Sequence, residues 1–340
     1  MEQSEQILLS GGGLRLAVIA DDLTGALDAG APFADRGLRV RVATDVAALA
    51  DALDGAEVVA VSTRSREIAP AAARSAVAVV LAGLPAGVPV FKKVDSRLKG
   101  NIAAELSAFP AGPVLAVPAL PEFGRMVRGG AVCGFGISSP IPVAPVLGRA
   151  AQVPDVETAE QMAAAVAGAG GALILGARGA AVALAQAMSK GTGARHALEL
   201  PMVIAVGSTD PITLAQVAAL RALPGLTVVE APDGQAAPQP GPGVTLVQAV
   251  PGVGATGPEV AAQMGKTVAR AAEGAASLVL TGGATAEAVL DGLVVRVLDL
   301  CGDMAPGLPL SLGGRWRIVT KSGGFGEAGA LLHLAQGAGR

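Results

Sequence analysis

Two adjacent carboxylates follow the first apolar run of the sequence. Asp21 and Asp22 end the segment LRLAVIADD and come directly before a stretch of helical composition that begins at Thr24. A helix start carries free N–H groups and the positive end of the dipole, so a carboxylate there can cap the helix, accept a hydroxyl proton or hold a metal ion. Capping needs only one acid, and a pair at the end of a strand therefore indicates a functional site.

A second group of polar side chains lies in the segment FKKVDSRLKGN. This segment has four cations against one acid, in a chain whose net charge is −3. Cations at a helix start are unfavourable unless an anion binds there, although a solvated basic surface is the simpler alternative. Cations that hold a carboxylate or phosphate, beside an acid that holds hydroxyl groups, suit a small polyhydroxy acid. The candidate residues are Lys93, Asp95, Ser96 and Arg97.

Two other strand ends carry charged side chains. Arg64, in STRSR, follows a third apolar run at the sheet edge equivalent to that of Asp22, and we add it to the candidate binding residues. Glu122 and Arg125, in PALPEFGR, form a further candidate pair, which a simple loop ion pair would explain equally well.

Three glycine-bearing turns follow strand candidates in the second half. They are VGSTD (206–210), TGGAT (281–285) and KSGGFG (321–326). Glycine lets the backbone approach a phosphate closely, and successive N–H groups form a concavity that binds anions. Each turn alone is weak evidence in a chain with 47 glycines, but three such turns in one domain indicate a nucleotide site.

The segment GVGATG (252–257) offers a different nucleotide. It matches the GxGxxG pattern of dinucleotide-binding folds, which would make the protein an NAD-dependent oxidoreductase. The acid that should end the following strand is missing, because that strand ends in Thr281 and glycine. We keep NAD binding as the less favoured alternative.

The elements that would position these residues alternate between short apolar runs and Ala-rich stretches. Strands are expected at 14–20, 38–44, 57–63, 88–94, 113–119, 201–209, 227–230, 244–250, 277–283 and 317–326, with a further strand, turn and helix in 172–188. Helices are expected from 24 toward 35, at 46–54, 70–83 and 101–108, from the end of the 201–209 strand to 222, and at 258–273, and a loop or hairpin at 128–154. The pattern predicts an α/β protein of two domains, 1–200 and 201–340, each with a mostly parallel sheet covered by helices. Ligands should bind beyond the carboxyl ends of the strands.

Composition excludes several classes of protein. The chain has 340 residues and is 51% hydrophobic and 16% charged, which is typical of a globular protein with a large core. Aromatic residues make up 2% and tyrosine is absent, so nucleic acid is an unexpected partner. Two distant cysteines, a non-basic N-terminus and apolar tracts broken by glycine favour a cytoplasmic protein without a membrane span.

Seven of these segments, in this order, resemble the four-carbon acid sugar kinase family. They are ADDLTGA, KKVDSRLKGN, VPALPEFGR, GARGAAVALA, VGST, TGGAT and KSGGFG, and they extend over most of the chain. The resemblance implies that the domain 1–200 binds a sugar acid and the domain 201–340 binds ATP with Mg²⁺. The active site would lie in the cleft between the domains, where the phosphoryl group passes to the terminal hydroxyl of threonate, erythronate or 3-oxotetronate.

The resemblance also implies roles for single residues. Asp22 or Asp95 would be the general base, and the sequence leaves the choice open. The substrate residues would be Asp22, Arg64, Lys93, Asp95, Ser96 and Arg97. The nucleotide residues would be Ser208, Gly282, Gly283, Ala284, Thr285 and Gly324, and no metal ligand is assigned.

Some positions depart from the family pattern. Arg97 and Lys99 stand where the family usually has Thr and Arg, and Thr281 and Ala284 stand where it tends to have Lys and an acid. These departures, with shortened loops, support a second alternative, a non-catalytic relic that binds sugar acid or nucleotide. The sequence also leaves a homo-oligomer open.

Overall fold

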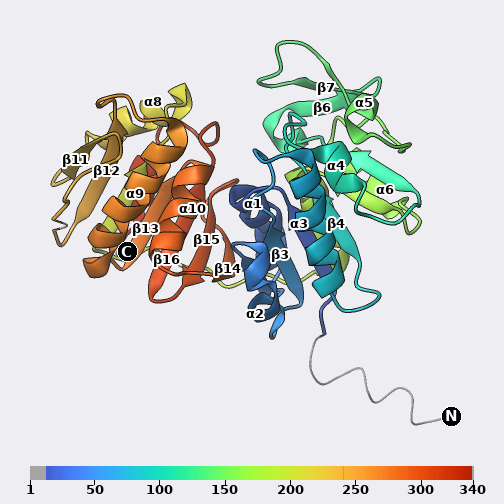
Figure 1. Cartoon of the computed structure of the whole chain (residues 1–340), viewed down its shortest axis with the longest axis horizontal. Helices are drawn as coiled ribbons and strands as arrows, with labels where there is room; N and C mark the ends of the chain where they lie inside the picture. The colour runs from blue at the N-terminus through green and yellow to red at the C-terminus, as the bar shows by residue number, and fades with distance from the viewer. Residues whose placement is uncertain (1–12, 240, 339–340) are drawn as a thin grey trace, which may run out of the picture.

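Strands from both halves of the chain form one sheet of thirteen strands (Figure 1). The computed structural model describes residues 13–239 and 241–338. The strand order is β11-β12-β10-β13-β16-β15-β14-β2-β3-β1-β4-β9-β5. The first half contributes β1 (Leu16–Ala20), β2 (Val40–Ala43), β3 (Val58–Ser62), β4 (Val90–Lys93), β5 (Val114–Val117) and β9 (Leu173–Gly176). The second half contributes β10 (Met202–Val206), β11 (Thr227–Pro232), β12 (Val244–Val250), β13 (Ser277–Thr281), β14 (Val297–Asp303), β15 (Pro309–Gly313) and β16 (Trp316–Lys321).

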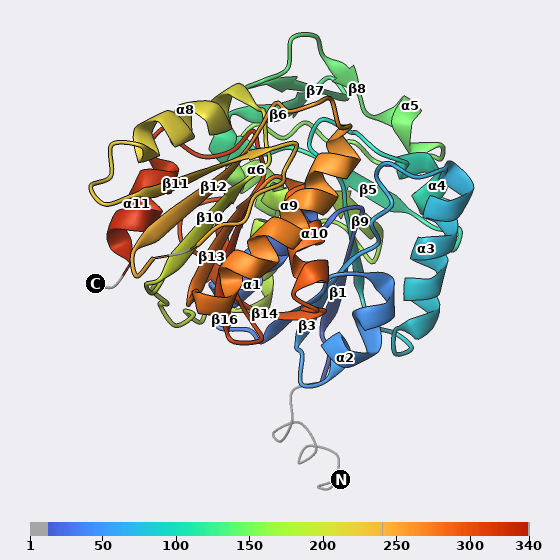
Figure 2. The ribbon, with the colours of Figure 1, turned by 60° about the vertical axis from the view of Figure 1, so that its left-hand side comes forward.

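Helices pack on the sheet in both halves (Figure 2). In the first half they are α1 (Leu23–Ala34), α2 (Leu49–Leu53), α3 (Pro70–Gly83), α4 (Ile102–Leu106), α6 (Ala159–Ala167) and α7 (Arg178–Met188), and the short α5 (Ala144–Leu147) lies beside α4. In the second half they are α8 (Pro211–Leu220), α9 (Gly257–Ala271), α10 (Gly283–Gly292) and α11 (Ala330–Gly337). Within the described ranges, none of these helices has the length and apolar composition that a membrane crossing requires.

A small antiparallel sheet extends from the first half. It consists of β6 (Arg125–Arg128), β7 (Ala131–Gly134) and β8 (Ile141–Pro142). This sheet confirms the hairpin expected between residues 128 and 154. It also places Arg125 and the turn after β7 beside the main sheet's functional edge, as described below.

Each half reverses its strand order at one point. The chain leaves β1 to form β2 and β3 on one side and then returns to place β4 on the other side. In the second half it leaves β10 to form β11 and β12 and then places β13 on the opposite side. Crevices beyond the carboxyl ends of strands at such switch points are where open α/β sheets bind ligands. The segments that follow β1, β4, β10 and β13 are therefore the structural candidates for binding.

The predicted α/β class is confirmed, but the two halves do not have separate sheets. An antiparallel pairing of β14 with β2 joins them, with Val297 opposite Ala43 and Leu300 opposite Val40. The sequence pattern predicted no strand at β14 or β15, and it indicated only a turn at the start of α10. The joining strand is thus the main feature of the fold that the sequence pattern did not predict.

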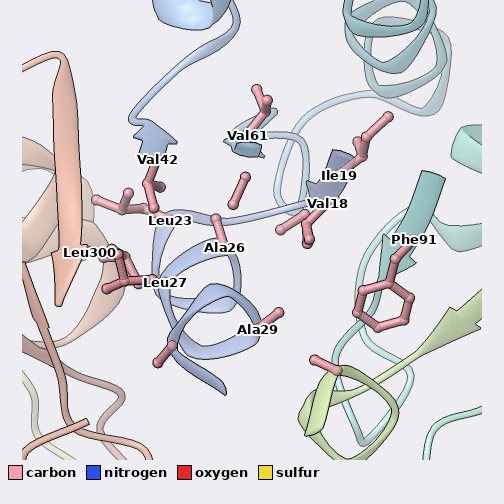
Figure 3. Packing of buried hydrophobic residues seen from close by; sticks show 14 of the residues in the cluster. Val18, Ile19, Leu23, Ala26, Leu27, Ala29, Val42, Val61, Phe91 and Leu300 are labelled. Atoms are coloured by element: carbon pink, nitrogen blue, oxygen red, sulfur yellow. The ribbon is translucent and has the colours of Figure 1, made fainter. Parts of the chain in front are cut away.

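Apolar packing reinforces this junction. Leu300 of β14 lies beside Leu23 and Leu27 of α1 (Figure 3). A Cβ added at Gly30 would lie 2.7 Å from Leu300 Cδ2, so glycine at this position of α1 lets the helix approach β14 closely. One buried apolar cluster therefore contains residues from both halves.

A buried guanidinium group also connects the two halves. Arg178, at the start of α7, pairs with Asp28 of α1 at 3.2 Å, with Glu122 at 3.0 Å, and with Asp303 at the end of β14. Because three carboxylates share one guanidinium group, their combined negative charge exceeds the single positive charge of Arg178. Burial raises the pKa of Asp303 to about 7, with Arg178 opposing the shift and Asp28 and Asp35 adding to it.

We expect Leu300→Ala to destabilise both halves together. Removing this buried side chain should lower the free energy of unfolding by about 2 to 4 kcal/mol. Urea unfolding followed by Trp316 fluorescence, which reports on the second half, and by far-UV circular dichroism should show both midpoints moving together. Leu312→Ala on β15, a partly exposed position, is the control and should cost less than about 1 kcal/mol. A shift of the fluorescence midpoint alone would show that the junction does not couple the halves.

We also expect the stability effect of Asp303→Asn to depend on pH. The raised pKa means that the folded protein holds a proton that the unfolded chain releases near 3.8, so the carboxyl costs stability as pH rises toward 7. Between pH 5 and pH 8 the unfolding free energy of the variant should rise relative to that of the parent by about 2 kcal/mol. Denaturant titrations at both pH values measure this difference, and an unchanged or opposite difference would contradict the raised pKa.

Candidate functional site

A cavity beyond the carboxyl ends of β1 and β4 is lined by residues from both halves of the chain. The first half contributes Asp22, Thr24, Gly25, Asp28, Arg66, Lys93, Asp95, Ser96, Leu120, Ala177 and Arg178. The second half contributes Gly307, Pro309, Thr320, Ser322 and Phe325. Four of the six substrate residues expected from the sequence thus meet here, and Arg64 and Arg97 do not line this cavity.

Asp22 serves both as a helix cap and as part of the cavity wall. Its Oδ1 accepts the Gly25 N–H at 2.8 Å, which caps α1, and its Oδ2 accepts the Thr24 hydroxyl at 2.8 Å. The same Oδ2 also accepts Arg66 Nη1 at 2.7 Å. Three donors therefore fix the orientation of this carboxylate before any ligand arrives.

Arg66 holds the neighbouring Asp21 as well. Its Nε and Nη2 donate to the two oxygens of Asp21 at 2.8 Å each, in a bidentate pair. Burial alone would raise the pKa of Asp21, but the hydrogen bonds and charge of Arg66, with the charges of Lys92 and Lys93, hold it below its ordinary value. Both acids therefore face a permanent cation, Arg66, which is not among the binding residues predicted from the sequence.

Neighbouring lysines on β4 have different roles because side chains alternate along a strand. Lys92 is fully buried on one face, where its Nζ pairs with Glu105 at 2.9 Å. Lys93 points to the cavity on the other face: a Cβ added at Gly25 would lie 3.2 Å from its Nζ. In the described part of the chain no residue accepts a hydrogen bond from Lys93 Nζ, so this cation is available for an anionic ligand.

The segment after β4 carries a carboxylate, Asp95, and a guanidinium group, Arg97, and it lies beside a second guanidinium group, Arg125 of β6. Asp95 Oδ1 accepts the Arg97 N–H at 2.8 Å, and its Oδ2 has no donor among the residues described by the structure. Ser96 Oγ accepts a hydrogen bond from Arg125, whose Nε and Nη2 also donate to the Phe135 carbonyl at 3.1 and 3.0 Å. Burial and the nearby charge of Arg97 lower the pKa of Arg125, with Asp95 opposing the shift. Two adjacent guanidinium groups at this rim favour an anion.

Arg64 belongs to the contact between the halves. Its Nη1 and Nη2 donate to the two oxygens of Asp291 on α10 at 2.7 and 2.8 Å. The backbone of Arg64 has a φ of +48°, a left-handed conformation that changes the direction of the chain after β3. Arg66, two residues further, lines the cavity in its place.

The three glycine turns of the second half meet at the carboxyl ends of β10, β13 and β16. A Cβ added at Gly323 would lie 2.6 Å from Ser208 Oγ, and one added at Gly324 would lie 3.5 Å from Asp210 Oδ2. A Cβ added at Gly282 would lie 3.7 Å from both Ser208 and Thr285 Oγ1. Ser208, Gly282, Gly283, Ala284, Thr285 and Gly324 are therefore grouped around the start of α10.

A buried lysine holds the third turn in shape. Lys321 Nζ donates to the carbonyls of Ser322, Gly323 and Phe325 at 2.9, 3.1 and 2.9 Å, and to the Thr213 hydroxyl at 3.2 Å. Burial lowers the pKa of Lys321 to about 8, and the charge of Asp210 opposes this shift. The ammonium group thus holds the carbonyls of the turn in one orientation.

The two groups of residues approach each other at the start of α10. A Cβ added at Gly283 would lie 3.6 Å from Thr24 Oγ1 and 3.8 Å from Asp22 Oδ2. Glu287, one turn further along α10, accepts the Leu23 N–H at 3.3 Å. The free N–H groups of α10, which favour a phosphate, therefore lie next to the Asp22 carboxylate.

The GVGATG segment is already occupied by a side chain of the protein. The buried carboxylate of Asp233 accepts the N–H groups of Gly252, Val253 and Gly254 at 3.1, 2.6 and 3.3 Å. A dinucleotide pyrophosphate would need these same donors. This geometry argues against the NAD alternative.

Comparisons with known proteins agree with this arrangement. Residues 16–143 match a sugar-binding N-terminal domain, and residues 235–331 match a nucleotide-binding C-terminal domain. A D-threonate kinase from Cupriavidus necator is 30% identical over 94% of this chain and 97% of its own length. A D-threonate kinase from Bordetella bronchiseptica is 31% identical over 96% and 98%. A D-erythronate kinase from Heliobacterium modesticaldum is 33% identical over 34% of this chain and 28% of its own length.

Solved structures share the fold. A Salmonella typhimurium LT2 protein described as a tRNA synthase superposes with a TM-score of 0.76 at 20% identity, over 94% of this chain and 98% of its own. A Haemophilus influenzae protein superposes with a TM-score of 0.68 at 20% identity, over 94% and 99%. These structures show the fold alone. By its nearly full-length relatives, the two D-threonate kinases, the chain belongs to the four-carbon acid sugar kinase family and is a sugar acid kinase.

Proposed function

We propose that this enzyme transfers the terminal phosphoryl group of ATP to the terminal hydroxyl of a four-carbon sugar acid. The observation that carries the proposal is the proximity of Asp22 to the start of α10, where Asp22 Oδ2 lies 3.8 Å from a Cβ added at Gly283. A carboxylate that can bind a hydroxyl group is thereby next to a helix start that favours phosphate. D-Threonate is the first candidate substrate, since both nearly full-length relatives carry that name. D-Erythronate and 3-oxotetronate are the next candidates.

The nucleotide would bind to the part of the chain from residue 201 to residue 340. Ser208, Gly282, Gly283, Ala284, Thr285 and Gly324 would surround its phosphates with backbone N–H groups and hydroxyls. Phosphoryl transfer relies mainly on positioning and on stabilisation of charge, and the convergent turns supply both.

The sugar acid would bind to the part from residue 1 to residue 200. Lys93 has an ammonium group without an acceptor in the described chain, and it would hold the carboxylate of the substrate. The free oxygen of Asp95 would accept a hydroxyl along the carbon chain. Arg66 replaces Arg64 in this proposal, because Arg66 lines the cavity and Arg64 pairs with Asp291. Ser96 and Arg97 would complete the rim.

Asp22 is the better candidate for the general base. A base must lie within hydrogen-bonding reach of the attacking hydroxyl, and that hydroxyl must lie against the transferred phosphoryl group. Asp22 is beside the start of α10, where we place this group, and three donors hold its carboxylate in place. Asp95 then positions the substrate without taking the proton.

Mg²⁺ would bind with the nucleotide, and the residues present fit it. Proteins usually hold Mg²⁺ through one or two carboxylates together with substrate phosphates, and the described residues contain no cluster of three metal-binding side chains. Asp210 Oδ1 caps α8 by accepting the Ile212 N–H at 2.9 Å, whereas Oδ2 faces the Gly324 turn. Asp210 would therefore hold the ion, which neutralises phosphate charge.

The first test is ADP release from Mg-ATP with threonate and erythronate stereoisomers, 3-oxotetronates, glycerate and five-carbon acids. ADP formed with one four-carbon acid supports the proposal and identifies the substrate. ATP that raises the melting temperature without any ADP release would instead indicate a non-catalytic relic. A shift with NAD and none with ATP would indicate the oxidoreductase alternative.

Asp22→Asn and Asp95→Asn should affect the kinetics differently. Removal of a general base should lower kcat by about 100- to 10,000-fold in Asp22→Asn, with ATP binding nearly unchanged. Loss of a hydroxyl acceptor in Asp95→Asn should mainly raise KM for the sugar acid, by about tenfold. Steady-state kinetics and calorimetric ATP titration measure these effects. The reverse pattern would make Asp95 the base, and equal loss of turnover and ATP binding in Asp22→Asn would contradict the two-part assignment.

Asp210→Asn should raise the Mg²⁺ concentration needed for half-maximal activity by about tenfold, because the amide is a weaker ligand than the carboxylate. Asparagine also caps helices well, so α8 should remain stable. Activity measured over a Mg²⁺ series at saturating ATP tests this, with Asp45→Asn, another helix cap, as the control. An unchanged Mg²⁺ requirement would show that Asp210 does not hold the ion.

A further inference from the structure

A second, larger cavity adjoins the proposed phosphate site. Its volume is about 550 Å³, within the range of small-molecule pockets. Its lining is mainly apolar and includes Ile212 of α8, Leu308 and Phe325. None of the residues assigned to the sugar acid in the proposed function lines this cavity, so it is free to take a different group.

The third glycine turn connects this cavity to the phosphate site. Gly323 packs against Ser208 on the phosphate side, and the following residues, Gly324, Phe325 and Gly326, line the apolar cavity. Phe325 lines both cavities. A ligand whose phosphates bind at the turns could therefore extend directly into the apolar space.

The first half supplies one wall of the cavity. The ring of Phe123 packs edge-on against Phe325, with centroids 5.4 Å apart and planes at 83°. Phe135, which follows β7, also lines the cavity and is 58% exposed, an unusual exposure for an aromatic side chain. Arg125 adds a cation at this wall. Aromatic rings, apolar side chains and a polar rim suit a flat heteroaromatic ring with polar edges.

We propose that this cavity binds the purine base of the nucleoside triphosphate, so that one nucleotide contacts both halves of the chain. The inference rests on the proposed function and extends it, because it assigns part of nucleotide recognition to Phe123 and Phe135 of the sugar-acid half. His333 and Glu327 at the rim offer hydrogen-bonding groups to the edge of the base. Bound ATP would thereby contact the β6–β7 hairpin together with α8 and α11.

The test compares ATP with inorganic tripolyphosphate, which has the phosphates and lacks the base. Calorimetric titrations would use the full chain and two variants, Phe135→Ser, at an exposed position, and Ile212→Trp, which fills the cavity from a half-buried position. Stacking contributions predict that Kd for ATP rises about fivefold or more in each variant, while Kd for tripolyphosphate stays within about twofold. Val253→Ser, a fully exposed apolar side chain of the second half outside the cavity, is the matched control.

The outcomes separate this inference from the proposed function. If the variants bind ATP as tightly as the parent, or lose ATP and tripolyphosphate equally, the base does not occupy this cavity, and ADP release by the parent would still support the kinase. If the parent binds tripolyphosphate as tightly as ATP, the base makes no contact and the inference is overturned. If the parent binds neither and releases no ADP, both the inference and the proposed function are overturned.

Discussion

The antiparallel pairing of β2 with β14 determines how the two parts of the site face each other. It reverses the strand direction between the halves, so in a flat sheet the carboxyl ends of β1 and β13 would lie at opposite edges. The two strands are separated by six steps from neighbour to neighbour, and a twist of about 20–25° per step adds to about 120–150°. Reversal and twist together return the two carboxyl ends to the same side. The contact of Gly283 with Asp22 depends on this geometry.

Charged side chains held in place by hydrogen bonds surround the position where the two parts of the site approach each other. Arg66 holds Asp21 and Asp22, and Lys321 holds the third glycine turn, so both surfaces are formed before a ligand binds. Preorganised groups lose little freedom when they bind charge, which suits phosphoryl transfer between two anions. Of the cations that line the first cavity, Arg66 and Arg178 are paired with carboxylates, whereas Lys93 has no acceptor among the described residues. Lys93 lies on the face of β4 opposite the Lys92–Glu105 pair.

The sequence predicted much of this structure because parallel strands and glycine turns leave local signals. Asp22, Lys93 and the three turns could be placed at strand ends from the alternation of apolar runs alone. Arg66 could not be distinguished from Arg64, because the left-handed backbone at Arg64 redirects the side chains that follow. β14 could not be predicted because its role depends on a partner strand more than 250 residues away in the sequence, and the glycines at the start of α10 indicated a turn where a helix begins. The apolar cavity is lined by side chains from separate segments of the chain, and no local sequence pattern predicts that these side chains come together.

Strand β14 limits how this protein can be recombined. By sequence it belongs with the nucleotide-binding part, yet it pairs with β2 and packs against α1 through Leu300. A chimera that exchanges everything after residue 200 for the same part of a distant relative would therefore import a foreign strand into the centre of the sheet. Such a graft should succeed only when the face of α1 around Gly30 is exchanged with it. The two parts are separate segments of the sequence, but the continuous sheet means that they must be exchanged together.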